Sequence, residues 1–174
     1  MMNNESHEIR WFVPEDGAPA PRPRSSGRRR VDRYHLGSLT PTSAVKARGT
    51  VRLEAKHRVG RVDEIDVNGC LGRAQRWVKK RPPSLDAKAA AGEEWIDVGK
   101  ELWRARCFEV ARITVPETDM AWWTIAVRVE DVPRAAADRR FAEWVPLLAG
   151  DGWSGAYPEW LLGVLCRSGE PLLA

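Results

Sequence analysis

Apolar and polar residues alternate along most of this chain, and glycine, proline and turn dipeptides interrupt the alternation at short intervals. Successive side chains of a β-strand point to opposite faces of a sheet, so a period of two indicates strands with one buried face. The longest regular run extends from Val51 to Val59 and ends at Gly60. Closely spaced strands of this kind are typical of antiparallel sheets and barrels. The predicted strands cover residues 8–12, 31–36, 43–48, 51–59, 71–80, 95–105, 108–115 and 122–129.

Turn and helix signals organise the rest of the chain. Asp66–Gly69 has the composition of a tight turn between strands, and Pro116 is expected to end the strand before it. Apolar residues then change to helical spacing over Arg134–Ala149, which Pro146 interrupts, and over Tyr157–Cys166. We therefore predict a mainly β (α+β) fold, an antiparallel barrel of about eight strands with the C-terminal helices packed outside.

Length and composition fit one domain. The 174 residues are 43% hydrophobic and 30% charged, which is enough for a core and a densely charged exterior. Residues 14–30 are rich in Gly, Pro, Ser and Arg, so we predict a flexible loop there. The first ten residues carry no apolar run, no stretch is long enough to cross a bilayer, and the three cysteines lack CxxC spacing. We expect a single cytoplasmic domain over residues 1–174, with reduced thiols and no membrane partner.

The charged residues are placed regularly. The formal net charge of +4 favours anionic partners. In several predicted strands the charged side chains share one face and apolar side chains share the other. In the strand at 95–105, Lys100 and Arg104 instead share a face with apolar residues. The charged positions that share a strand face are Glu8 and Arg10, Lys46 and Arg48, Arg52, Glu54, Lys56 and Arg58, and Arg128 and Glu130.

Two interpretations of these faces stay open. One face of an antiparallel sheet is often solvated and polar, with no ligand involved. A phosphate ligand, in contrast, requires cations to neutralise its oxygens and carboxylates to hold a bridging divalent ion. Thr, Ser and Gln, which an exposed face usually mixes in, are scarce at these positions. The recurrence of the pattern on five strands favours the ligand.

The short charged motifs also follow one another in a family-like order. They are Ser6-His7-Glu8-Ile9-Arg10, then Asp32 with Tyr34, Lys46-Ala47-Arg48 followed by Lys56, Lys100 with Arg104, and Arg128-Val129-Glu130. This order resembles the CYTH superfamily, the triphosphate tunnel enzymes that include one class of adenylyl cyclases and thiamine triphosphatases. The resemblance spans nearly the whole chain, from Ser6 to Leu165. The family's opening ExExK strand corresponds to the first motif, in which Ser6 replaces the first acid, Glu8 is the second acid and Arg10 replaces the lysine.

The resemblance implies a charged barrel lumen that binds a triphosphate-containing compound and, in an active enzyme, hydrolyses it with Mg²⁺ or Mn²⁺. Together with the strand faces it predicts two sets of ligands. The predicted phosphate-binding residues are Arg10, Lys46, Arg48, Lys56, Arg58, Lys100 and Arg104. The predicted metal ligands are Glu8, Glu54 and Glu130.

Ser6 and Arg128 stand where the family pattern has acids. We therefore expect metal binding and metal-dependent triphosphate hydrolysis to be weaker than phosphate binding. Two alternatives remain from other classes of protein. One is a non-catalytic module that senses a polyanion such as polyphosphate or a nucleotide. The other is a nucleic-acid-binding β-barrel that stacks bases on Trp77 and Trp103.

Overall fold

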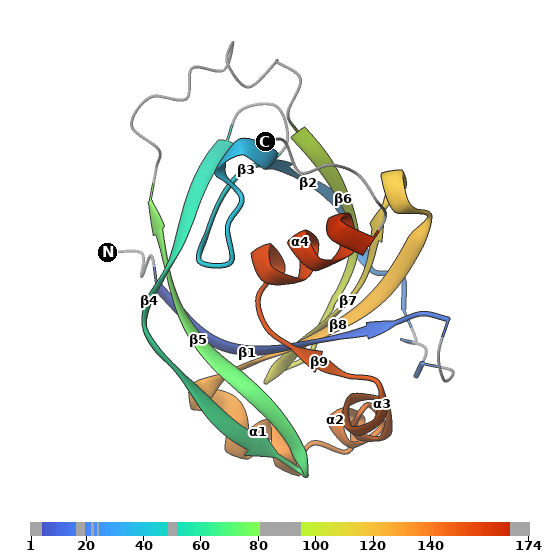
Figure 1. The fold of residues 1–174 in the computed structure, drawn as a ribbon. Coiled ribbons are helices and arrows are strands. Elements are labelled where there is room, and N and C mark those ends of the chain that lie inside the picture. Colours follow the sequence, from blue (N-terminus) through green and yellow to red (C-terminus); the bar gives the residue numbers. More distant parts are fainter. Residues whose placement is uncertain are drawn as a thin grey trace.

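A closed antiparallel barrel forms the body of the protein (Figure 1). The computed structural model describes residues 5–16, 20–21, 23, 25–48, 52–80 and 95–167. Its strands are β1 (Glu5–Pro14), β2 (Arg28–His35), β3 (Ser43–Arg48), β4 (Arg52–Val67), β5 (Cys70–Lys80), β6 (Trp95–Arg104), β7 (Phe108–Val115), β8 (Met120–Arg128) and β9 (Trp153–Ser154). Their order is β5-β4-β3-β2-β6-β7-β8-β1-β9, and β1 also pairs with β5, which closes the first eight strands into a ring. The predicted mainly β barrel is confirmed.

Around β1, β7 and β8 both faces of the barrel wall are packed, which explains why these strands are rich in large apolar residues. Outward-facing Ile9, Trp11 and Val13 of β1 belong to an apolar cluster that includes Phe141 and Trp144 of the C-terminal segment. The ring of Trp11 lies 6.3 Å from that of Phe141. Because these outward side chains are held in an apolar layer, the alternate residues of β1 are turned toward the barrel interior.

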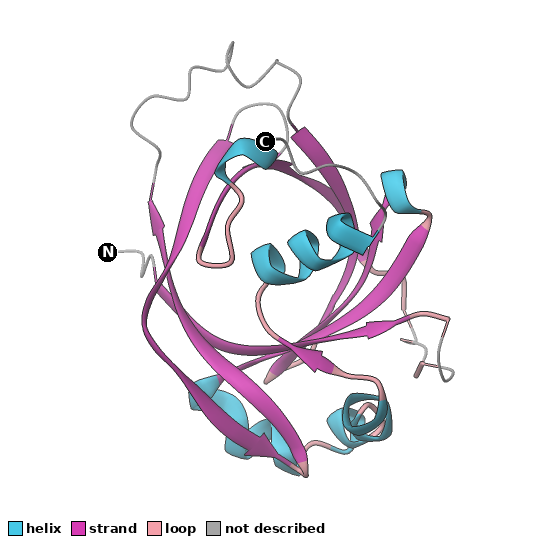
Figure 2. Ribbon diagram, in the orientation of Figure 1, coloured by secondary structure: helices cyan, strands magenta, loops and turns pink. Residues whose placement is uncertain are grey.

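The C-terminal helices divide between the outside and the inside of the barrel (Figure 2). They are α1 (Val132–Ala137), α2 (Arg139–Ala142), α3 (Val145–Gly150) and α4 (Tyr157–Arg167). The first three supply the outer cluster, as predicted. In contrast, α4 packs against the interior side of the strands, and Trp160 stacks on the inward-facing Phe12 with ring centroids 5.1 Å apart. One end of the interior is therefore an apolar core built around α4.

The predicted helix over Arg134–Ala149 is three short helices. Asp138 has an extended backbone and caps α2 by accepting a hydrogen bond from the Arg140 amide. Pro146 lies in the first turn of α3, a position that a proline occupies without losing a helical hydrogen bond. Capping and proline placement thus break the segment into turns that follow the curved wall. No helix of the described part of the chain is both long enough and apolar enough to cross a membrane.

Two glycines shape the hairpin of β4 and β5. The turn predicted at Asp66–Gly69 is confirmed, with φ values of 56° at Asn68 and 82° at Gly69. Gly60, however, does not end its strand. It has a φ of 71° within β4, next to a register shift against β5 between Val59 and Asp63. The glycine therefore marks a bulge that bends a strand of 16 residues.

The predicted loop at 14–30 is shorter than expected. Strand β1 continues through Pro14, and β2 already begins at Arg28. Residues 17–19, 22 and 24 of the predicted loop lie outside the described residues, as does Val51 at the start of the fourth predicted strand.

Candidate functional site

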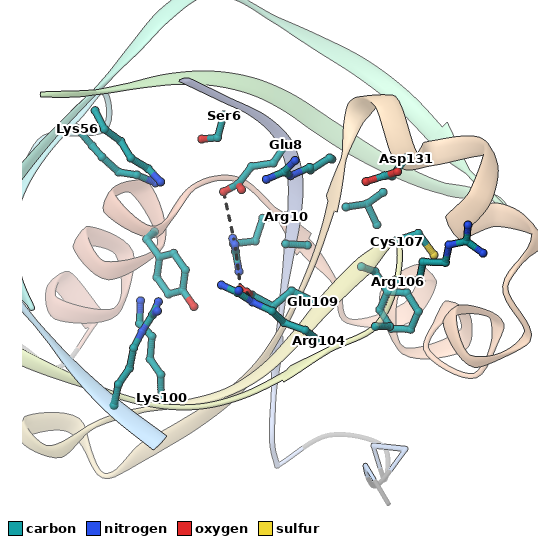
Figure 3. A pocket seen from close by; sticks show the side chains of 18 of the residues that line it. Ser6, Glu8, Arg10, Lys56, Lys100, Arg104, Arg106, Cys107, Glu109 and Asp131 are labelled. Carbon is teal, nitrogen blue, oxygen red and sulfur yellow. Dashed lines mark hydrogen bonds and ion pairs between the residues drawn. The ribbon is translucent and has the colours of Figure 1, made fainter. Parts of the chain in front are cut away.

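The part of the barrel interior not occupied by α4 contains a cavity of about 360 Å³ (Figure 3). It extends from Tyr157, at the start of α4, to Ala105–Cys107 in the turn between β6 and β7. Ten basic residues line it: Arg10, Arg30, Lys46, Arg48, Lys56, Lys79, Lys100, Arg104, Arg106 and Arg128. Three acidic residues line it: Glu8, Glu109 and Asp131. The cavity is therefore strongly cationic.

Strand alternation brings most of the predicted site residues to this cavity. Those that line it are Glu8, Arg10, Lys46, Arg48, Lys56, Lys100 and Arg104. Across β2 and β3, the register pairs Tyr34 with Lys46 and Asp32 with Arg48, so these four residues share one face of the wall. Lys46, Lys100 and Arg10 are at most 7% exposed, so these charges are held inside the barrel and not on a solvated sheet face.

Three predicted residues do not line the cavity. Arg58 donates to Glu159 of α4 at 3.1 Å, a contact that joins segments far apart in the sequence. Glu54 is buried behind the lining, 3.6 Å from Lys46 and 3.8 Å from Arg48. Glu130 is not in a strand at all, because β8 ends at Arg128, and its side chain is 62% exposed beside that arginine.

Asp32 organises one wall of the cavity, a role that sequence reasoning did not give it. Its carboxylate is fully buried and lies 2.8 Å from the Nζ atom of Lys100. Burial alone would raise the pKa of Asp32, but Lys100 and Lys46 outweigh it and hold that pKa well below its usual range. The carboxylate is also in contact with Arg30 Nε at 3.3 Å, Lys46 Nζ at 3.5 Å and Arg48 Nε at 3.5 Å. One ionised acid thus orders four cations.

The carboxylates near Lys100, Lys46 and Lys56 do not offset the cost of burying these lysines, so the pKa of each is lowered. Burial lowers the pKa of Lys100 to about 7, although Asp32 opposes the shift. Burial also lowers the pKa of Lys46, and its like-charged neighbours Lys56 and Lys100 lower it further. The pKa of Lys56 is lowered mainly by burial too. An anion entering the cavity would favour the protonated form of each.

A second group surrounds the guanidinium of Arg10. It donates to Thr124 at 3.1 Å and is 3.5 Å from Glu8 and 3.6 Å from Glu109. Burial by itself would raise the pKa of Glu8, but Arg10 and Lys56 lower it to about 2. Glu8 is therefore an ionised partner of cations.

Each of the three predicted metal ligands lies in an ion pair with a basic residue. Glu8 lies against Arg10, Glu54 against Lys46 and Arg48, and Glu130 is exposed at the end of β8. Among the described residues, no group of three or more His, Cys, Asp or Glu side chains is placed to hold a metal ion. Mg²⁺ and Mn²⁺ need several converging oxygen ligands, so the carboxylates of the described residues do not fit such an ion.

The start of α4 completes the cavity. The Nζ atom of Lys100 lies 3.5 Å from the centre of the Tyr157 ring, and the guanidinium carbon of Arg10 lies 4.8 Å from it. Glu159, two residues later, is bound by Arg58 at 3.1 Å and by the Gln75 amide at 2.9 Å. Sequence reasoning missed Tyr157 because it lies in a helix, where strand parity gives no information.

The indole rings of the two tryptophans considered for base stacking are held by contacts within the chain. Trp77 is 2% exposed, and its indole donates to Gln75. Trp103 packs against Trp123 at 5.8 Å, and a Cβ atom added to Gly27 would lie 2.7 Å from its ring. Trp103 contributes instead to a neighbouring depression of about 340 Å³, which shares Arg30 and Arg104 with the cavity.

Comparison with known proteins does not assign the chain to a family, since neither a protein-family model nor a curated protein matches it. What the structure shows is a closed barrel of eight antiparallel strands with short C-terminal helices. The resemblance to the CYTH superfamily consequently rests on the order of the charged motifs.

Proposed function

We propose that this protein binds a triphosphate-containing compound in the cationic cavity of the barrel. The observation that carries the proposal is the convergence of ten basic and three acidic side chains on one interior space. Lysine and arginine neutralise phosphate oxygens, and arginine does so through two parallel hydrogen bonds. The cations proposed to contact the phosphates are Arg10, Lys46, Arg48, Lys56, Lys100 and Arg104.

The arrangement of the cations supports a phosphate chain over a single phosphate group. Basic residues reach the cavity from β1, β2, β3, β4, β5, β6 and β8, and from the turn that contains Arg106. They extend from the region of Tyr157 to that turn. A linear polyanion can contact cations along this whole length, whereas one phosphate group reaches only a few of them. The adjoining depression leaves room for an organic group on the chain.

The contacts support binding of the triphosphate by cations alone, without a metal ion held by the protein. The three acids that line the cavity are already paired with arginine, Glu8 and Glu109 with Arg10 and Asp131 with Arg134. We do not propose nucleic-acid binding, because the indoles of Trp77 and Trp103 are packed against other parts of the chain.

Isothermal titration calorimetry with inorganic triphosphate at low ionic strength tests the proposal. We expect binding in the presence of EDTA, and an affinity that decreases as salt is added, because salt screens charge–charge attraction. Absence of binding at millimolar triphosphate, with or without Mg²⁺ or Mn²⁺, would overturn the proposal. Affinity that grows with the length of an oligonucleotide lacking a triphosphate would point to nucleic acid instead. Phosphate release, measured with and without each metal, separates a hydrolase from a binding module.

A further inference from the structure

Tyr157 is the first residue of α4 and the point where this helix reaches the cationic cavity. Its ring is close to two cations from different strands of the wall, Lys100 of β6 at 3.5 Å and Arg10 of β1 at 4.8 Å. A lysine ammonium within about 6 Å of an aromatic ring centre is attracted by the ring's electron density. The contact between Lys100 and Tyr157 is the shortest of the cation–ring contacts among the described residues.

A network at the start of α4 fixes the position of this ring. Glu159 accepts hydrogen bonds from Arg58 at 3.1 Å, from the Gln75 amide at 2.9 Å and from the Ala156 backbone amide at 3.1 Å. Arg73 lies 3.5 Å from the same carboxylate. These contacts join α4 to both β4 and β5. Tyr157 is thus held against the cavity by a network that does not itself line it.

Lys100 is a buried cation whose charge depends on its immediate surroundings. It is 4% exposed, and burial lowers its pKa to about 7, so that it is only partly protonated near neutral pH. The residue paired with it on β7, Ile113, is apolar. The charged and titratable groups that face it from the other elements are Asp32, Tyr34 and Arg30 of β2, Arg10 of β1, Lys46 of β3 and Tyr157 of α4.

We infer that Tyr157 is a positioning residue whose ring holds the ammonium group of Lys100, together with Arg10, at the inner end of the cavity to receive the end of the phosphate chain. The inference rests on the proposed function for its ligand, but the contact with Lys100 exists without one. The ring acts through its electrons, so the phenol hydroxyl is not required. A phenylalanine should replace the tyrosine, and an aliphatic residue should not.

Two measurements on the full chain test this inference. The first is an NMR titration of the Lys100 ammonium in the ligand-free protein, for the unmodified chain, Tyr157→Phe and Tyr157→Leu. We expect the Leu variant to titrate about 0.4 to 1.5 pH units lower, the range that corresponds to a cation–π contact, and the Phe variant to match the unmodified chain. The second is the affinity for inorganic triphosphate, which should weaken roughly 2- to 30-fold in the Leu variant alone.

The outcomes separate this inference from the proposed function. An unchanged Lys100 titration in Tyr157→Leu, or a failure of Tyr157→Phe to restore it, overturns the role of the ring. Absence of triphosphate binding in every form overturns the proposed function, while the titration still decides the role of Tyr157. If Tyr157→Leu does not fold, Tyr157→Met has the same expectation, because methionine is unbranched and adapts to irregular space.

Discussion

Asp32 and Lys56 represent two kinds of residue in this cavity. Asp32 is fully buried and in contact with four cations, so its removal would disturb the wall as a whole. Lys56 lies over the ring of Trp77 at 5.8 Å and forms no ion pair with another residue in the described part of the chain. Its substitution would remove a charge from the cavity, and Glu8, whose pKa Lys56 helps to lower, would keep Arg10 as its partner. Lys56 is the better probe of ligand binding.

We predict that Lys56→Ala weakens binding of inorganic triphosphate by at least about 30-fold. Loss of one cation that contacts a buried anion costs roughly 2–5 kcal/mol of binding free energy. Titration calorimetry of the variant measures the change. The matched control is Arg61→Ala, on the same strand, whose side chain is 87% exposed beside Asp63. Equal losses in the two variants would attribute binding to the overall charge of the surface and not to the cavity.

At the scale of elements, alternation predicted the strands well, and helical spacing predicted α4 almost to its bounds but not the division of Arg134–Ala149 into three short helices. In β1 the polar positions Glu8 and Arg10 line the cavity, because the opposite positions are held in the outer apolar layer. In β3, Lys46 and Arg48 line it from the same strand face as the buried Ala44. Strand parity says nothing about Tyr157 or Glu159, which reach the barrel from a helix. Nor does it reveal that Gly60 lies at a bulge, since a glycine can either end a strand or bend one.

Gly60 and Gly163 permit a matched prediction about backbone conformation. Neither would bring a new Cβ atom within 4 Å of another group, so Ala introduces no collision at either site. Gly60 has a φ of 71°, where an alanine is strained, and Gly60→Ala should lower the free energy of unfolding by about 1–2 kcal/mol. Gly163 lies inside α4, and Gly163→Ala should raise it by about 0.5–1 kcal/mol. Urea unfolding of both variants measures the difference, and changes of the same sign would contradict this account of the bulge.

At the scale of the whole molecule, the interior changes character along the barrel. Around α4 it is an apolar core with Phe12, Ile113 and Leu161, and beyond Tyr157 it is a charged cavity. This arrangement could not be predicted from the sequence, because it depends on where the last helix enters a barrel formed by the earlier strands. The cavity nevertheless contains most of the site residues predicted from strand parity.

The buried ion pairs make the stability of the barrel depend on acid pH. The pKa of Glu8 is about 2 in the folded protein, against an ordinary value of 4.5, and that of Asp32 is also lowered. Groups with lowered folded-state pKa values stabilise the fold above the unfolded-state value and lose that effect as the pH falls through the folded-state value. We therefore predict that the free energy of unfolding decreases by a few kcal/mol between about pH 5 and pH 2, from the shift of Glu8 alone by up to about 3 kcal/mol.

Urea unfolding at a series of pH values measures this dependence. Glu8→Gln should flatten the decrease at acid pH, since the amide does not titrate. Glu130→Gln is the control, because that carboxylate is 62% exposed and should contribute little. An identical pH dependence in the unmodified chain and in Glu8→Gln would show that Glu8 is not stabilised by Arg10 and Lys56.

The excess of basic over acidic residues in the cavity, ten against three, also affects the stability of the ligand-free protein. Enclosed like charges repel one another, so the barrel without a ligand is less stable than its apolar packing would make it. Any small anion that enters relieves this repulsion and binds the folded chain in preference to the unfolded one, which raises the melting temperature. Phosphate in the buffer would then stabilise the folded chain, and the melting temperature would depend on which anions the solution contains and at what concentration.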